Sequence, residues 1–171
     1  MISLFRFIAA LYVGVGLGSA LAAPAPLKPP SGEPILEITG QIEAKNTPTS
    51  ATFDREMLEA IGLTKVKTTT PWHSGTVEFE GIPLSKLLDS VGATGKTVRA
   101  VALNDYASSI PISDFAAHGV ILALKRDGQY MPVRDKGPLF IIYPYDSSPE
   151  LKSQMYYARS VWQVKRLEVL P

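Results

Sequence analysis

The sequence contains no cysteine and only two histidines, His73 and His118. Without cysteine the protein can form no disulfide, iron–sulfur cluster, thiolate zinc site or cysteine nucleophile. The two histidines fall on different predicted elements with no acidic residue at ligand spacing, which disfavours a metal site built from them. A Ser-His-Asp hydrolase is also disfavoured, because no Gly-x-Ser-x-Gly turn is present to expose a nucleophile.

Long runs of one charge are missing as well. The 171 residues carry a formal net charge of +1, and lysine and arginine form no stripe or cluster. Nucleic-acid binding needs such a basic surface, so nucleic acid is excluded as a partner. With 46% hydrophobic residues, the chain can instead build the core of one globular domain.

The N-terminus has the pattern of a cleaved secretory signal peptide over residues 1–22. Arg6 precedes an apolar run from Phe7 to Leu17, and the small residues Ala20-Leu21-Ala22 suit a signal peptidase. The predicted location is the bacterial periplasm. Residues 23–34 are a proline-rich lead that can form neither a helix nor a central strand, and the predicted domain covers residues 35–171.

The domain is predicted to be α+β, strand-rich, with two or three short helices. One amphipathic helix follows Asp54 and ends before Gly62, and a second follows Pro83 and ends before Gly92. The remaining apolar segments are short and predict strands at 35–42, 76–79, 97–103, 120–125, 129–131, 139–143 and 161–169. Asp127-Gly128 predicts a two-residue hairpin, and a change of apolar phase in the last strand predicts a bulge near Lys165.

Two segments combine aromatic and hydrogen-bonding side chains. Trp72-His73 lies between proline and glycine and offers a stacking surface with a polar tip. The alternative is that Trp72 fills the edge of the core and His73 is solvated. Asn104-Asp105-Tyr106 ends a buried strand, where the acid can accept two parallel N–H donors from a flat heterocycle while the phenol ring stacks on it. Its alternative is an ordinary Asx turn.

A third segment, Arg134-Asp135-Lys136, is held by Gly137-Pro138 at the mouth of the buried strand 139–143. A charged loop on a rigid strand is typical of a binding site, and the alternative is a solvated loop with weak local ion pairing. Arg159, just before the last strand, is predicted to face the same mouth.

These segments belong to an ordered set of motifs that resembles the oxidoreductase molybdopterin-binding domain of the sulfite oxidase superfamily. The motifs are Phe79-Glu80-Gly81-Ile82-Pro83-Leu84, Ala102-Leu103-Asn104-Asp105-Tyr106, Ile121-Leu122-Ala123 with Asp127-Gly128, Arg134-Asp135-Lys136-Gly137-Pro138-Leu139, and Ser160-Val161-Trp162. The resemblance implies the sulfite oxidase-type fold from about Ile35 to Val169. In the catalytic branch a metal-binding cysteine would fall in or near Thr68 to Trp72, where this chain has threonines and Pro71.

The missing thiolate makes the chain more similar to a small exported branch that binds free pterins. The resemblance then implies a non-catalytic sensor that reports pterin to the periplasmic domain of a membrane-bound diguanylate cyclase or phosphodiesterase. It implies a pterin ligand, no catalytic cofactor and no molybdenum, since a threonine hydroxyl does not replace a thiolate on that metal. Two alternatives stay open: a molybdopterin-dependent oxidoreductase with a cysteine-free metal site, and a protein-interaction module without a ligand.

The chemistry of a pterin suits the candidate residues. Its 2-amino group and ring N–H match one carboxylate, Asp105 or Asp135, and we predict Asp105. Its flat bicycle can stack on Trp72 or Tyr106. A hydroxylated or phosphorylated side arm suits the remaining polar candidates, which are Arg134, Lys136 and Asn104.

Overall fold

The computed structural model describes residues 26–171, so the predicted signal peptide and the first residues of the lead lie outside the described part. From residue 26 to Pro34 the lead forms neither helix nor strand, as predicted. It still packs on the domain: Leu27 contacts the core, and the N–H groups of Ser31 and Gly32 each donate to Asp54 Oδ2 at 2.8 Å. Within residues 26–171 no helix is long and apolar enough to cross a membrane.

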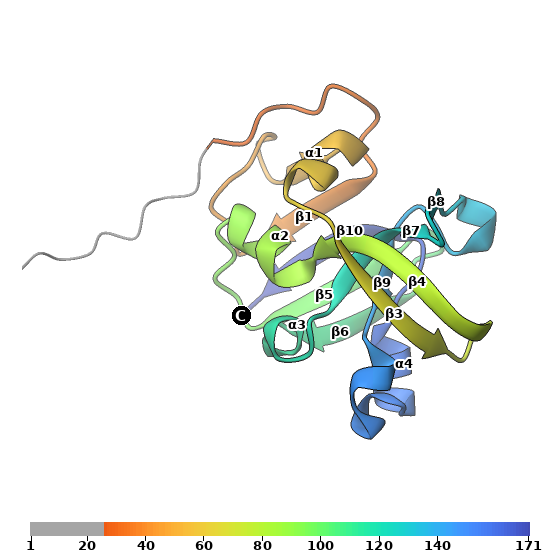
Figure 1. Ribbon diagram of the computed structural model, residues 1–171. Coiled ribbons are helices and arrows are strands. Elements are labelled where there is room, and N and C mark those ends of the chain that lie inside the picture. The colour runs from red at the N-terminus through yellow and green to blue at the C-terminus, as the bar shows by residue number, and fades with distance from the viewer. Residues whose placement is uncertain (1–25) are drawn as a thin grey trace, which may run out of the picture.

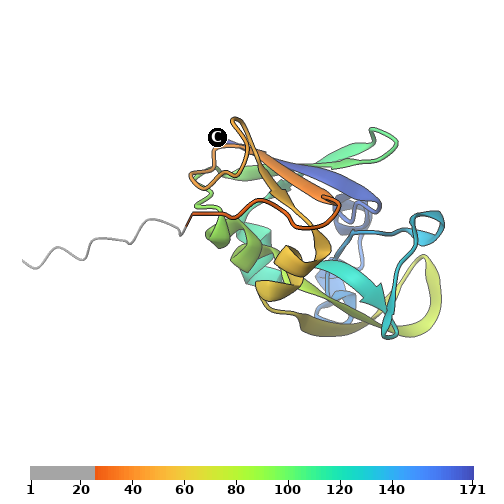
Figure 2. The ribbon, with the colours of Figure 1, turned by 90° about the horizontal axis from the view of Figure 1, so that it is seen from above.

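Two five-stranded sheets form the domain, and Figure 2 shows them on opposite sides of the molecule. The first has the order β2-β1-β10-β5-β6, and only its β1–β10 pair is parallel. The second has the order β3-β4-β7-β8, with β9 paired antiparallel to β7. The strands of the first sheet are β1 (Leu36–Gly40), β2 (Ala51–Phe53), β5 (Thr97–Ala102), β6 (Ala107–Pro111) and β10 (Val164–Leu170). Those of the second are β3 (Thr64–Thr70), β4 (His73–Pro83), β7 (Ile121–Arg126), β8 (Gln129–Tyr130) and β9 (Phe140–Ile142).

The described residues form four short α-helices, where the sequence predicts two or three. They are α1 (Arg55–Ala60), α2 (Leu84–Ser90), α3 (Ser113–His118) and α4 (Gln154–Arg159). The two predicted helices are α1 and α2, and the Asp54 side chain caps α1 by accepting from Met57 N at 2.9 Å. α3 and α4 have six residues each, too few for a periodic apolar stripe to indicate them. α1 and α4 lie at opposite ends of the molecule (Figure 1).

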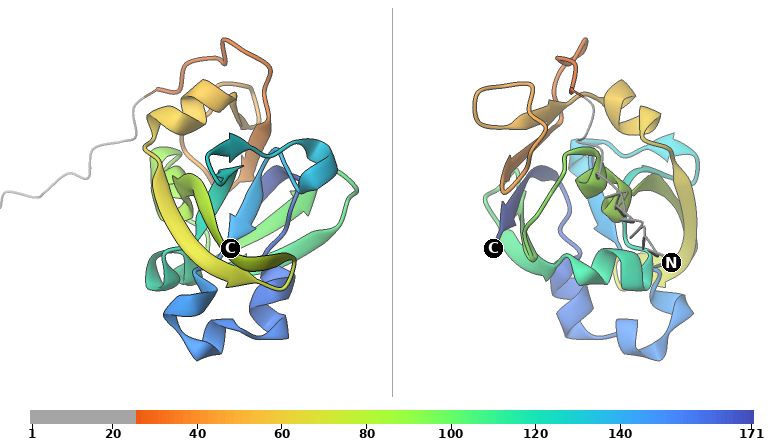
Figure 3. Two further views of the ribbon diagram at one scale, coloured as in Figure 1. Left: turned by 45° about the vertical axis from the view of Figure 1, so that its right-hand side comes forward. Right: turned by 90° about the vertical axis from the view of Figure 1, so that its left-hand side faces the viewer.

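The local turn and bulge predictions are confirmed. β7 and β8 are joined by Asp127 and Gly128, both with positive φ (49° and 78°). The register between β10 and β5 shifts between Val164 and Arg166, which places the bulge at Lys165. β4 begins at His73, earlier than the predicted start, and with β3 it forms the long curved hairpin seen in Figure 3.

The core has two parts, and the larger one lies between the two sheets. The larger part joins residues of both sheets with α1, α2, α3 and α4. The smaller part lies at the far side of the second sheet and consists of Val77, Phe79, Ile121, Ala123, Met131, Phe140 and Ile142. Trp72 packs against both parts. The turn that carries Trp72 is therefore fixed by the core on either side of it.

Candidate functional site

Trp72 lies in the turn between β3 and β4 and is the centre of an aromatic cluster. Its ring centroid is 5.4 Å from that of Phe140, 5.7 Å from that of Trp162 and 5.9 Å from that of Tyr157. These tilted and edge-on contacts are the favoured arrangements of aromatic pairs. The prediction of an exposed Trp72-His73 pair on a loop is wrong, because both side chains are half-buried and His73 opens strand β4. The alternative, in which Trp72 fills the edge of the core, is confirmed.

His73 is held through both ring nitrogens. Nε2 lies 2.9 Å from Arg126 Nη1, and Nδ1 lies 3.0 Å from Thr70 Oγ1. A guanidinium can only donate, so Nε2 accepts and the proton of the neutral ring is on Nδ1, where it donates to Thr70. Burial, followed by the charges of Arg126 and Lys136, lowers the pKa of His73. The histidine is thus neutral near pH 7 and orients Arg126.

Arg126 joins His73 to Asp135. Its Nη2 donates to Asp135 Oδ2 at 2.7 Å, and this bond holds the pKa of Asp135 below its usual range. The Asp135 side chain is still 39% exposed, so the carboxylate can accept a further donor from a ligand. Sequence reasoning missed Arg126. Its one signal is its place, since a charged residue ends the buried strand β7 directly before the hairpin turn.

The loop that carries Asp135 is built by close backbone packing. Val133–Asp135 form a 3-10 helix, and Lys136 follows with φ 66° while its carbonyl accepts from Gln163 N at 3.0 Å. A Cβ on Gly137 would lie 1.8 Å from the carbonyl oxygen of Met131, so only glycine fits there. Lys136 Nζ lies 5.5 Å from the ring centroid of Trp162, within the range of a cation–π contact.

Four of the predicted site residues therefore come together with Arg126 and Trp162. We call this group the Trp162 cluster: Trp72, His73, Arg126, Asp135, Lys136 and Trp162. Its outermost ring is that of Trp162, which is 37% exposed. Arg134 is exposed on the same loop. The cluster thus combines an exposed aromatic face, a carboxylate and cationic side chains.

Asn104, Asp105 and Tyr106 form a separate group. Asn104 Oδ1 accepts from Tyr106 N at 3.2 Å, the Asx turn of the alternative interpretation. Asp105 has φ 65°, and its carboxylate, 83% exposed, pairs with Lys165 Nζ at 2.7 Å. This hydrogen bond lowers the pKa of Asp105. The Tyr106 hydroxyl donates to the carbonyl of Ala158. Asp105 therefore has Lys165 as its partner, whereas Asp135 is held by Arg126 and precedes Lys136, whose ammonium lies over the Trp162 ring.

Arg159 lies in a different environment from the Trp162 cluster. Its Nη1 donates to Asp114 Oδ2 at 2.7 Å, and its guanidinium carbon is 5.3 Å from the ring centroid of Tyr156. The same carboxylate oxygen accepts from the Tyr143 hydroxyl at 2.8 Å. Arg159 thus joins α4 to α3 and the core, and the structure does not bring it to the loop of Asp135.

The threonine segment at the end of β3 is engaged in packing contacts. Thr68 Oγ1 accepts from Asp146 N at 3.1 Å, and Thr69 donates to the Asp146 carboxylate through both N and Oγ1 at 2.6 Å. Lys152, followed by Thr69, lowers the pKa of Asp146 strongly. With Thr70 bonded to His73, all three hydroxyls have protein partners.

This segment does not fit molybdenum. It offers no thiolate, and its hydroxyls are both chemically unsuited to the metal and already bonded. Among residues 26–171 no group of three or more His, Cys, Asp or Glu is placed to hold a metal ion. The rings and the carboxylate of the Trp162 cluster, by contrast, suit the flat, N–H-bearing pterin part of a molybdopterin.

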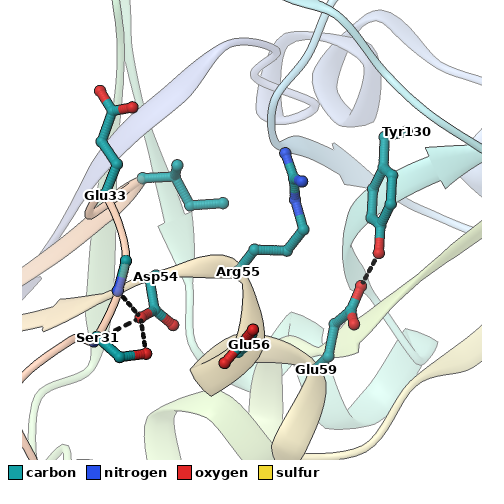
Figure 4. A pocket seen from close by; sticks show the side chains of 9 residues that line it. Ser31, Glu33, Asp54, Arg55, Glu56, Glu59 and Tyr130 are labelled. Carbon is teal, nitrogen blue, oxygen red and sulfur yellow. Dashed lines mark hydrogen bonds between the residues drawn. The ribbon is translucent and has the colours of Figure 1, made fainter.

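A surface pocket of about 580 Å³ lies elsewhere, between the lead, α1 and Tyr130. Figure 4 shows Glu33, Glu56 and Glu59 around Arg55, with Tyr130 bonded to Glu59 at 2.6 Å. Arg55 lies 4.3 Å from the ring centroid of Tyr130. The pocket contains none of the predicted site residues.

Comparison with known proteins identifies the family. The family model described as oxidoreductase molybdopterin binding domain matches residues 36–170. No match is found among curated proteins. Among solved structures, the crystal structure of the sulfane dehydrogenase SoxCD from Paracoccus pantotrophus matches with a TM-score of 0.58 and 21% identity. The match covers 79% of this chain and 37% of that one, and at this identity it concerns the fold alone. The chain therefore belongs to the oxidoreductase molybdopterin-binding domain family and has the predicted α+β, sulfite oxidase-type fold.

Proposed function

We propose that this protein binds a free pterin at the Trp162 cluster and has no catalytic activity. The observation that carries the proposal is Asp135, a partly exposed carboxylate that Arg126 fixes, directly before Lys136, whose ammonium lies over the exposed ring of Trp162, in a family whose domain binds molybdopterin. The chain keeps groups for a pterin ring and has no thiolate for the metal.

In the proposed complex each group of the cluster has one task. The Asp135 carboxylate accepts the 2-amino and ring N–H donors of the pterin, a charge-assisted and bidentate contact. Trp162 stacks on the bicycle, and the Lys136 ammonium, now above that ring, moves on its flexible side chain to the polar side arm. Arg126 and His73 hold Asp135 in place. The earlier prediction of Asp105 as the acid that binds the ring is thereby replaced by Asp135.

We further propose that the pterin complex is the signalling form. By the resemblance stated above, an exported protein would dock on the periplasmic domain of a membrane-bound diguanylate cyclase or phosphodiesterase. Pterin can change the output of that enzyme only if it binds the docked and free states with different affinity. Arg134, Tyr106 and Trp162 are exposed and so are available for such a contact.

The test is a calorimetric titration of the purified protein with tetrahydrobiopterin and with its oxidised form. The metal content of the same sample is measured as well. We expect saturable pterin binding, no stoichiometric molybdenum, and weakened binding in Asp135→Asn and Trp162→Leu. Asp105→Asn is the matched control, because it removes a carboxylate of the neighbouring group and leaves the Trp162 cluster intact.

Other outcomes would favour the alternatives. Stoichiometric molybdenum after production in a host that makes the cofactor would contradict the proposal and support an oxidoreductase with a cysteine-free site. Absence of binding to either pterin would also contradict it, and would support a protein-interaction module.

A further inference from the structure

A row of aromatic rings leads from the surface into the core. It begins at Trp162, which is 37% exposed, and continues through Trp72, Tyr145 and Tyr143 to Tyr156. Successive ring centroids are 5.7, 6.2, 6.3 and 5.2 Å apart. We call these five residues the ring row. Each step is a direct ring contact, so an electron can pass from one ring to the next without crossing saturated side chains.

The row contains only side chains that can lose one electron, two tryptophans followed by three tyrosines. A tyrosine also loses its phenolic proton when it is oxidised, and a buried tyrosine therefore needs a base beside its hydroxyl. The hydroxyl of Tyr145 is bonded to that of Ser160, which is not such a base. Tyr145 can pass an electron on but cannot readily stay oxidised.

Two tyrosines of the row do have a base: Tyr156 donates to Glu150 Oε1 at 3.1 Å, and Tyr143, one step nearer to Trp162, has the shorter bond. Its hydroxyl, fully buried, donates to Asp114 Oδ2 at 2.8 Å, and the Arg159 guanidinium holds this oxygen at 2.7 Å. The Asp114 carboxylate is thus fixed within hydrogen-bond distance of the phenol, where it can accept the phenolic proton. Burial, and then the bond to Asp114, raise the pKa of Tyr143 far above its usual range, so the phenol does not ionise on its own.

We propose that the ring row is a path for oxidising equivalents, which conducts one electron from Tyr143 to an oxidant at Trp162. An oxygen-derived one-electron oxidant takes an electron from Trp162 and is reduced. Trp162 regains its electron from Trp72, Trp72 from Tyr145, and Tyr145 from Tyr143. There the O–H bond breaks: the electron moves toward Trp162, the proton goes to Asp114, and the products are a neutral tyrosyl radical and a carboxylic acid. The oxidant gains one electron and Tyr143 loses one, so the step balances.

This role would move oxidative damage away from the exposed end of the Trp162 cluster. It does not depend on pterin binding, since every group in it belongs to the chain. The structure also supplies a comparison. Tyr130 donates to the carboxylate of Glu59 at 2.6 Å, as Tyr143 does to Asp114, but none of the described ring pairs connects it to the row.

The experiment uses the purified protein and photogenerated tris(bipyridyl)ruthenium(III), with electron paramagnetic resonance after rapid freezing. The exposed Tyr106 and Tyr130 and the half-buried Tyr157, whose ring contacts Trp72, are first changed to phenylalanine, so that a tyrosyl signal comes from the buried tyrosines. In this background we expect a tyrosyl radical that is lost in Tyr143→Phe and in Trp162→Leu. Asp114→Asn should also lose it, because an amide does not take the proton.

Near-ultraviolet circular dichroism checks that each variant is folded. Trp162→Leu changes an exposed side chain and tests the path even where a change at Tyr143 disturbs the core. A tyrosyl signal of undiminished size in folded Tyr143→Phe or in Trp162→Leu would overturn the proposal. An oxidising equivalent that stays on tryptophan in the background protein would overturn it as well.

Discussion

Removing the ion pair between Arg159 and Asp114 tests whether Arg159 stabilises the fold or binds the ligand. The sequence places Arg159 at the ligand, whereas the structure gives it a role in stability. In Arg159→Met an unbranched apolar side chain is kept and the guanidinium over Tyr156 is removed, so Asp114 keeps only the Tyr143 hydroxyl as a partner.

The expected cost follows from the burial of the pair. Removing one partner of a buried ion pair destabilises a protein by about 3–5 kcal/mol, because a charge is left without compensation. The side chains here are 19% and 12% exposed, so water can solvate the remaining carboxylate in part. We therefore expect a loss of about 2–3 kcal/mol in the free energy of unfolding, below the fully buried range.

Urea denaturation at pH 7 measures this loss, and a double-mutant cycle with Asp114→Asn isolates the pair. The double variant should be more stable than the sum of the single losses predicts, by about 1–3 kcal/mol. Pterin affinity should be unchanged in Arg159→Met. A loss under about 0.5 kcal/mol, the range of an exposed pair, would refute the reasoning. Lost pterin binding in a protein of unchanged stability would restore Arg159 as a ligand residue.

Three further results are expected. Asp135→Asn should weaken pterin binding by about 1.5–3 kcal/mol, the contribution of a hydrogen bond to a charged group, while Asp105→Asn leaves calorimetric affinity unchanged. Because the pKa of His73 is lowered in the folded state, the unfolded chain binds a proton at His73 at a higher pH than the folded protein does. The melting temperature should therefore be highest above about pH 6.5 and fall as the pH drops below it. A His73→Gln variant should show a flatter profile, and an equal slope would contradict this. Gly137→Ala should cost about 1–3 kcal/mol in urea unfolding, since its Cβ would overlap Met131 O. Unchanged stability would refute that steric argument.

The sequence predicts those features of the fold that depend on neighbours in the chain. Asp54 caps α1 as its position before an apolar repeat indicates, and Asp127-Gly128 closes a hairpin because both residues tolerate positive φ. The bulge at Lys165 was visible as a break in the two-residue period. Short elements are different: β2 has three residues and α4 has six, too few to carry a period.

The site depended on contacts between distant residues, which no local pattern contains. His73 and Arg126 are 53 positions apart, and only the pairing of β4 with β7 brings them together. Asp105 and Asp135 look equally suitable in the sequence, since each ends or follows a strand beside an aromatic or charged residue. The two acids differ in the cation that pairs with each. The β10 bulge places Lys165 opposite Asp105, and the end of β7 places Arg126 opposite Asp135.

The same distant contacts explain why a pterin can be proposed without the metal. In this chain the proposed ring-binding groups lie on the end of β7, the loop of Asp135 and Trp162, whereas a metal-binding cysteine would lie on the end of β3. There Thr68 and Thr69 bind Asp146, 77 or more positions further on, and so fasten the 3-10 helix Tyr145–Ser147, which follows β9, to β3. A thiol at Thr69 would lose a 2.6 Å hydroxyl contact to a carboxylate, and a thiol is a weak donor. The threonines thus have a structural role, the attachment of Asp146 to β3, that a cysteine at Thr69 would not fulfil.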